Sequence, residues 1–178
     1  MVRFEPDMED IRATTRIFEQ GDYELKVKRV RGFAYTREQD GVEIYGADVN
    51  FEMVGPLLSD GTLGDDFAGE DVSRLRTFWH TKGAMEMSKR NVMAIAGFSR
   101  EEEEEFNAWV KDGNSFAIIG DDEDPEADVE LGSGWQQLVG NRVHASLTVQ
   151  LYQRKDDDGN PVGEPEEQQN FQSLRPVS

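Results

Sequence analysis

Five segments of the chain alternate apolar with polar residues, and this period of two is typical of a half-buried β-strand. The longest segment covers residues 138–154, where Val143, Ala145 and Leu147 alternate with polar side chains. A Gln-Asp-Gly turn at 39–41 separates the first two segments, as in a hairpin. The predicted strands are residues 21–30, 42–54, 75–81, 138–154 and 168–175.

Two helices are predicted between the third and fourth strands. Apolar residues recur through 83–98 at helical spacing. Ser99 and Glu102 then have the spacing of a capping box, which predicts a second helix that ends near Lys111. Residues 120–130 are strongly acidic and are expected to form a flexible loop.

This order of elements predicts a mainly β fold: a five-stranded OB-fold-like barrel with a helical insertion between strands 3 and 4 and long acidic loops. Residues 1–19 lack a clear period and are expected to be an N-terminal leader. Residues 20–178 are expected to form a single OB-fold-like domain, with the helical and acidic insertion at about 83–131. A length of 178 residues suits one domain with a sizeable core.

Composition excludes several protein classes. There is no cysteine, so disulfide frameworks and thiolate metal sites are excluded. No stretch approaches the roughly 18 apolar residues of a membrane span, and the first residues lack the apolar region of a signal peptide. The sequence therefore predicts a cytoplasmic protein without membrane contact.

The net charge of −18 is concentrated in two segments. Residues 99–130 contain 13 acidic and 2 basic residues, and residues 156–167 contain 6 acidic and no basic residues. The rest of the chain is nearly balanced. Because local potential decides what binds to a given face, a basic face elsewhere on the molecule remains available to a nucleic acid.

No enzymatic constellation is present in the sequence. The chain has two histidines, His80 and His144, and no motif of a nucleophilic triad, a zinc protease or a phosphate-binding loop. The acidic run at 121–124 does not fit a calcium loop, because the glycine and glutamate that such a loop needs are missing at its sixth and twelfth positions. We expect no catalytic residues, no metal site and no cofactor.

Basic and aromatic residues gather on the predicted strands, and this combination favours single-stranded nucleic acid. Aromatic rings can stack on bases while cationic side chains contact phosphates. Phe78 and Trp79 point to opposite faces of their strand, and the pattern leaves open which one is exposed. The residues expected to contact phosphates are Lys26, Lys28, Arg29, Arg31, Arg76 and Arg142, and those expected to stack on bases are Phe33, Tyr35, Trp79 and Tyr152.

Short motifs in the chain resemble a family of phage-encoded OB-fold proteins. They are GDYE at 21–24, the strand-to-helix block at 78–97, the GNRV of 140–143 and the final strand of 171–176 that reaches a proline. The resemblance covers most of the chain from about residue 18. It implies a non-enzymatic single-stranded-DNA-binding protein of phage replication or recombination, in the host cytoplasm, with replication or recombination proteins as further partners.

Two other functions compete with this interpretation. The five consecutive glutamates at 101–105 and the overall acidity suit a DNA mimic or a protein-interaction module, although carboxylates also stabilise the first turn of a helix. A β-rich acidic chain also suits a virion structural protein. A mimic should ignore DNA and bind a basic protein, whereas a virion protein should assemble without nucleic acid. Homo-oligomerisation is left open.

Overall fold

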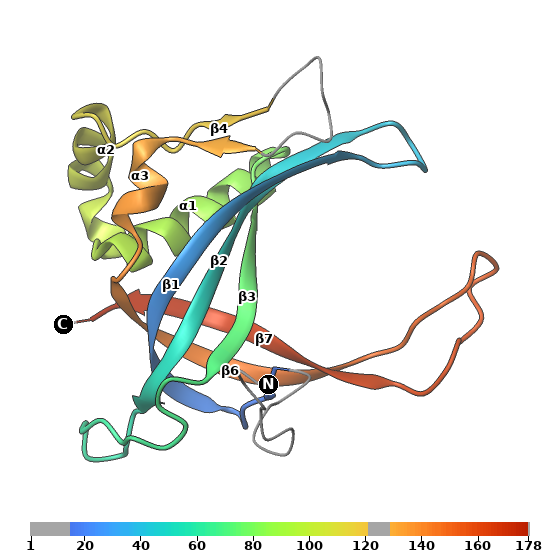
Figure 1. The fold of residues 1–178 in the computed structure, drawn as a ribbon, viewed down its shortest axis with the longest axis horizontal. Helices are drawn as coiled ribbons and strands as arrows, with labels where there is room; N and C mark the ends of the chain where they lie inside the picture. Colours follow the sequence, from blue (N-terminus) through green and yellow to red (C-terminus); the bar gives the residue numbers. More distant parts are fainter. Residues whose placement is uncertain (1–14, 121–128, 178) are drawn as a thin grey trace, which may run out of the picture.

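The computed structural model describes residues 15–120 and 129–177 (Figure 1). Seven strands and four helical segments follow one another along the described chain. They are β1 (Gly21–Thr36), β2 (Glu43–Pro56), β3 (Asp71–Phe78), α1 (Lys82–Ala96), the 3-10 helix η2 (Arg100–Glu102), α2 (Glu103–Lys111), β4 (Ile118–Ile119), β5 (Glu130–Leu131), α3 (Ser133–Gln137), β6 (Arg142–Tyr152) and β7 (Glu166–Pro176).

The long strands form one antiparallel sheet in the order β3-β2-β1-β6-β7. The protein is therefore mainly β, with a helical insertion between the third and fourth long strands, as predicted. The closed barrel is not seen. Among the described residues, β3 and β7 do not pair, because a cleft lined by Asp71–Arg74 and Glu167–Gln169 separates these two edges.

The predicted helices are confirmed, with small shifts at their ends. The Thr81 hydroxyl accepts the Ala84 N–H at 3.2 Å and caps α1, and Gly97 ends the helix with a φ of 95°. The Ser99 N–H donates to the Glu102 carboxylate at 3.0 Å, which is one half of the predicted capping box. The glutamate run therefore begins a helix.

Some elements differ from the prediction. The first strand extends to Thr36, beyond the predicted end at residue 30, because its outer half pairs with β2 all the way to the hairpin turn. The short strands β4 and β5 and the helix α3 were not predicted, since each has at most five residues and shows no measurable period. The acidic residues 121–128 of the predicted loop lie outside the described residues.

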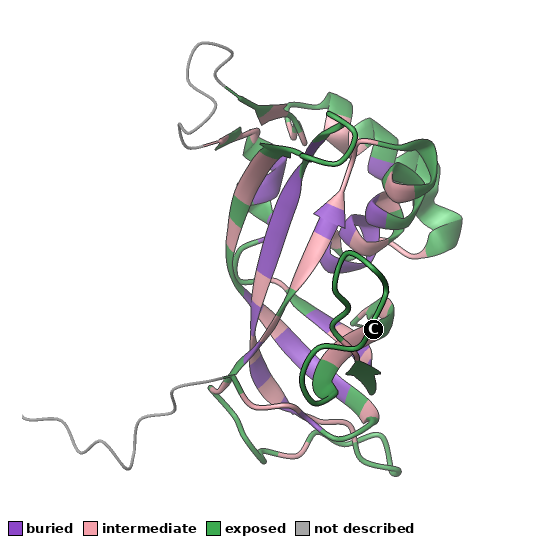
Figure 2. Ribbon diagram, turned by 90° about the vertical axis from the view of Figure 1, so that its right-hand side faces the viewer, coloured by how far each residue is buried: buried purple, intermediate pink, exposed green. Residues whose placement is uncertain are grey.

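The core lies between the sheet and the helical insertion (Figure 2). Leu25, Phe51 and Val143 point from the sheet toward Ile95 of α1 and the fully buried Trp135 of α3. The sheet side chains come from positions two apart, as the alternation predicted.

Burial along β6 stops earlier than the alternation suggests. Leu147 is fully buried, whereas Val149 is 37% exposed and Leu151 is 73% exposed. Past Leu147 the strand pairs with β7 alone and extends beyond the core as an arm (Figure 1).

Part of the predicted leader belongs to the folded body. Phe18 is 2% exposed and joins the core cluster, and Arg16 forms an ion pair with Glu70 at 3.0 Å. Residues 1–14 lie outside the described residues. No helix in the described parts of the chain is long and apolar enough to cross a membrane.

Candidate nucleic-acid interface

One face of β1, β2 and β3 points away from the helices and is called the outer face here. The strand register brings its residues together in rows. Phe33 of β1 and Phe78 of β3 flank Gly46 of β2, and Arg31 and Arg76 flank Asp48 in the next row. Because side chains alternate between the two faces of a strand, these residues share the face opposite the core positions Ala47, Val49 and Thr77.

An aromatic cluster lies on the outer face, near the β1–β2 hairpin turn and the end of β3. The rings of Phe33 and Phe78 meet edge to face at 5.5 Å, and Tyr35 stacks on Phe33 at 6.2 Å with an interplanar angle of 29°. Tyr35 is 46% exposed and presents a ring to solvent. A Cβ on Gly46 would lie 2.8 Å from the Phe33 ring and 1.9 Å from the Thr77 carbonyl oxygen, so only glycine lets the chains approach this closely.

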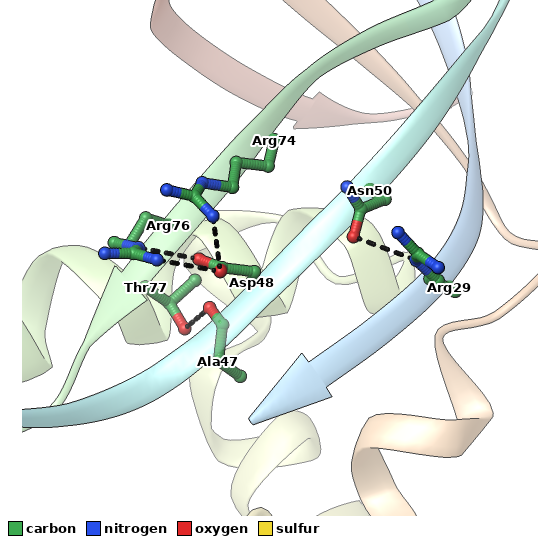
Figure 3. Close-up of polar contacts among 7 residues, drawn as sticks. All are labelled: Arg29, Ala47, Asp48, Asn50, Arg74, Arg76 and Thr77. Carbon is green, nitrogen blue, oxygen red and sulfur yellow. Dashed lines mark hydrogen bonds and ion pairs between the residues drawn. The ribbon is translucent and has the colours of Figure 1, made fainter. Parts of the chain in front are cut away.

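A buried carboxylate holds two arginines beside this cluster (Figure 3). Asp48 is 8% exposed and accepts hydrogen bonds from Arg76 Nε at 2.9 Å and Nη2 at 3.1 Å. Arg74 Nη1 lies 3.4 Å from the same carboxylate. The hydrogen bonds to Asp48 raise the pKa of Arg76 above its ordinary value, so this guanidinium stays charged.

Arg76 also forms part of the aromatic surface. Its Cζ lies 4.3 Å from the centre of the Phe33 ring, which is the geometry of a cation–π contact. Because Asp48 accepts two hydrogen bonds from the guanidinium, Arg76 is held over that ring. The two side chains together place a fixed cation against the aromatic cluster.

Charge on the strands of the outer face is balanced, unlike the charge of the whole chain. The strands β1, β2 and β3 contain six cationic and six acidic residues, whereas the chain as a whole carries −18, and the cations gather at 26–31 and 74–76. Several of the cations already have partners. Lys28 pairs with Asp71 at 2.8 Å, Lys26 lies 4.0 Å from Glu52, and Arg29 Nε reaches Asn50 at 3.5 Å (Figure 3).

The cleft between β3 and β7 continues this cationic surface. It has a volume of about 700 Å³ and is lined by Lys28, Arg29 and Arg74 together with the carboxylates of Asp71 and Glu167. It is therefore a cleft of mixed charge, and no residue of the aromatic cluster lines it. Three of its cationic side chains come from the same strands as that cluster.

Most of the predicted phosphate and base contacts lie on this face. β1 carries Lys26, Lys28, Arg29, Arg31, Phe33 and Tyr35, and β3 carries Arg76. Arg142 lies opposite Lys26 on β6, and its guanidinium donates to Glu24 at 3.1 Å.

Two predicted stacking residues lie elsewhere. Trp79 packs against the core, with its ring 5.8 Å from Trp135 and its Nε1 donating to the Thr77 hydroxyl at 3.0 Å. Of the adjacent residues Phe78 and Trp79, it is Phe78 that belongs to the outer face. Tyr152 is 50% exposed on the arm, at a point where β6 pairs only with β7, so the sheet does not bring it to the cluster.

Sequence reasoning missed some members of this face, although a signal existed for part of them. Phe78 has the same parity as Arg76, which was expected to contact phosphates, and this parity selects Phe78 over Trp79. Asp48 and Asn50 alternate in the sequence with the core residues of β2, but their pairing with arginines on neighbouring strands depends on register. The close approach at Gly46 has no local signal.

Neither a protein-family model nor a curated protein matches this chain. The family resemblance therefore remains a prediction from short motifs. Within the described residues, no group of three or more histidine, aspartate or glutamate side chains is placed to hold a metal ion.

Proposed function

We propose that the protein binds single-stranded DNA on the outer face of β1, β2 and β3. The observation that carries the proposal is the Phe33–Phe78–Tyr35 cluster with Arg76 fixed over the Phe33 ring. Sequence-tolerant binding of single strands combines rings on which bases stack with cationic side chains along the backbone. Duplex DNA offers no unstacked base to such a surface.

The strand order supports an open form of the OB-fold. In chain order the long strands are arranged 3-2-1-4-5, and a pair between the third and fifth strands would close them into a barrel. OB-folds bind oligonucleotides on the face of strands 2 and 3, between the loop that joins strands 1 and 2 and the loop that joins strands 4 and 5. Here the β1–β2 and β6–β7 hairpins project on the same side of the molecule (Figure 1). The outer face lies on β1, β2 and β3, and the cleft lies between the edges of β3 and β7.

The ion pairs on the face define how phosphates would bind. Lys28 and Arg76 are engaged by Asp71 and Asp48, so a phosphate must compete with a carboxylate for them. Stacking on the aromatic cluster then contributes a larger share of the affinity than the count of basic residues suggests. A phage replication or recombination role comes from the sequence resemblance alone, and the binding experiment does not depend on it.

The test is fluorescence-anisotropy binding to a labelled oligo(dT) of about 30 nucleotides, at low and moderate salt, with duplex DNA alongside. We expect binding to the single strand and not to the duplex, with an affinity that falls as salt rises. Absence of binding at low salt would refute the proposal and turn attention to the acidic surface and to protein partners.

A matched pair of tyrosines tests the location of the site. Tyr35 and Tyr45 lie on the same hairpin, are 46% and 37% exposed, and belong to opposite faces of the sheet. Because stacking one base on a ring contributes about 1–3 kcal/mol, Tyr35→Ala should weaken binding roughly tenfold or more. Tyr45→Ala should leave the affinity unchanged. Equal effects of the two substitutions would place the DNA elsewhere.

A further inference from the structure

A second groove lies along the free edge of the sheet and shares no residue with the cleft described above. Its walls are α1 from Glu86 to Ala94, the corner at 98–103, and the second half of β7 from Asn170 to Pro176. It has a volume of about 950 Å³. No residue of β6 lines it, so the groove follows the edge of β7 rather than the face of the sheet.

The floor of the groove is apolar. Met93 and Phe98 from the helical side face Phe171 and Leu174 from β7, and all four pack against the core. At the rim, Met87 is 64% exposed. An apolar groove with an exposed methionine is typical of a protein interaction site, since the flexible thioether side chain adapts to different apolar partners.

The edge of β7 offers backbone hydrogen bonds to an extended ligand. β7 pairs with β6 on one side and with no described strand on the other, where α1 packs against part of it, so outward N–H and C=O groups are available only along the stretch that α1 leaves open. The bulge at Gln172 and the missing N–H of Pro176 restrict this ladder to a few residues. A bound strand must therefore gain the rest of its affinity from side chains.

Two cationic side chains on the rim are available to such a ligand. Arg90 and Arg100 are exposed and form no ion pair with any residue that the structure describes, whereas Lys89 pairs with Glu103 at 2.8 Å. Met87, Arg90 and Ala94 follow each other at helical spacing and form one stripe along the groove. Glu86 and Glu101 also line the rim, and they would repel a continuous chain of phosphates.

We propose that this groove binds an extended peptide segment of a partner protein, with apolar residues at alternating positions flanked by single acidic residues. The apolar side chains fill the floor, the acidic ones pair with Arg90 and Arg100, and the backbone adds to the edge of β7. This inference does not rest on DNA binding, because the groove and the outer face are separate surfaces.

The test begins with a random decapeptide display library selected against the full chain. We expect enrichment of sequences that alternate apolar residues and include an acidic flank. The selected peptide, added to the ¹⁵N-labelled protein, should shift amide signals of 86–94 and 170–175 and leave those of 44–50 unchanged. A library without enriched peptides, or shifts confined to other regions, would overturn the proposal.

Two matched pairs of variants on α1 complete the test. Met87→Glu and Arg90→Glu change the groove, whereas Met85→Glu and Lys82→Glu change the same helix at exposed positions outside it. Each groove variant should weaken the selected peptide by about tenfold, and the controls should not. Equal effects within each pair would contradict the assignment.

Two other ligands could occupy the groove, a second copy of the chain or DNA, and each would give a different experimental result. If the amides of 170–175 shift with protein concentration in the absence of peptide, and sedimentation shows a dimer that Arg90→Glu dissociates, the groove is an interface between two copies and the peptide proposal is wrong. If oligo(dT) shifts the same amides, the groove belongs to the DNA site and the proposal is also wrong.

Discussion

Replacing Asp48 by asparagine tests how the arginines of the outer face are held. The carboxylate is 8% exposed and accepts two hydrogen bonds from Arg76 at 2.9 and 3.1 Å, with Arg74 at 3.4 Å. Asp48→Asn keeps the shape but removes the charge, and it places an amide N–H₂ against a guanidinium that can only donate. A hydrogen bond to a charged group contributes about 1.5–3 kcal/mol. Arg76 remains 29% exposed, so water replaces part of the loss.

We therefore expect Asp48→Asn to lower the free energy of unfolding by about 1–3 kcal/mol. The measurement is urea denaturation followed by the fluorescence of Trp79, Trp109 and Trp135, at neutral pH. The control is Asp71→Asn, because Asp71 and Lys28 form an ion pair at 2.8 Å with side chains that are 60% and 53% exposed. Such an exposed pair contributes at most about 1 kcal/mol. Equal losses in the two variants would refute the view that Asp48 is a structural anchor of this face.

Three further predictions follow from single contacts. Gly46→Ala should destabilise the protein by about 1–3 kcal/mol or more, because the added Cβ would meet the neighbouring strand. A Cβ on Gly83 of α1 meets nothing within 4 Å, so Gly83→Ala should stabilise the protein by about 0.5–1 kcal/mol. Thermal denaturation compares the two variants. Trp79→Phe should lower the stability of the protein through lost packing and a lost hydrogen bond, and it should leave the affinity for oligo(dT) unchanged. A loss of affinity at unchanged stability would show that Trp79 contacts the DNA. The Ser146 hydroxyl, followed by Arg175, holds the pKa of Asp22 below its usual range, so Ser146→Ala should raise that pKa in an NMR titration. The stability that the lowered pKa of Asp22 contributes is present above the unfolded-state pKa of about 3.9 and is lost as the pH falls through the folded pKa. The difference in stability between Ser146→Ala and wild type should therefore shrink below about pH 3.9. A difference that stays constant with pH would contradict this cause.

Local pattern predicted most of the secondary structure correctly. The alternation of Tyr23, Leu25 and Val27 identified the inner face of β1, and the Ser99–Glu102 spacing identified the start of a helix. These signals are readable because side-chain direction within a strand and hydrogen bonding at a helix end depend only on neighbouring residues. The same parity placed Lys26 and Lys28 outside the core, whereas Arg29 and Arg31 face outward only because the register shifts between Val27 and Arg29.

Pattern was less informative where an element is short or extends beyond the core. The alternation of β6 continues to Leu151, but nothing covers that side chain, and its 73% exposure depends on where the helices lie. Phe78 and Trp79 present the same ambiguity, since adjacent residues on a strand always point to opposite faces. Only the packing of Trp79 on Trp135 decides which ring belongs to the core.

The sequence by itself determined the mainly β class, the helical insertion, and the alternating core positions of β2, of the first half of β1 and of the first half of β6. The tertiary structure decided that Phe33 lies against Phe78, that Asp48 joins Arg74 and Arg76, and that the sheet stays open between β3 and β7. The physical reason is that these contacts join residues far apart in the chain. They depend on the register across β2, including its irregularity between Val49 and Phe51, and a shift of one residue would reverse the faces. No local pattern encodes that register.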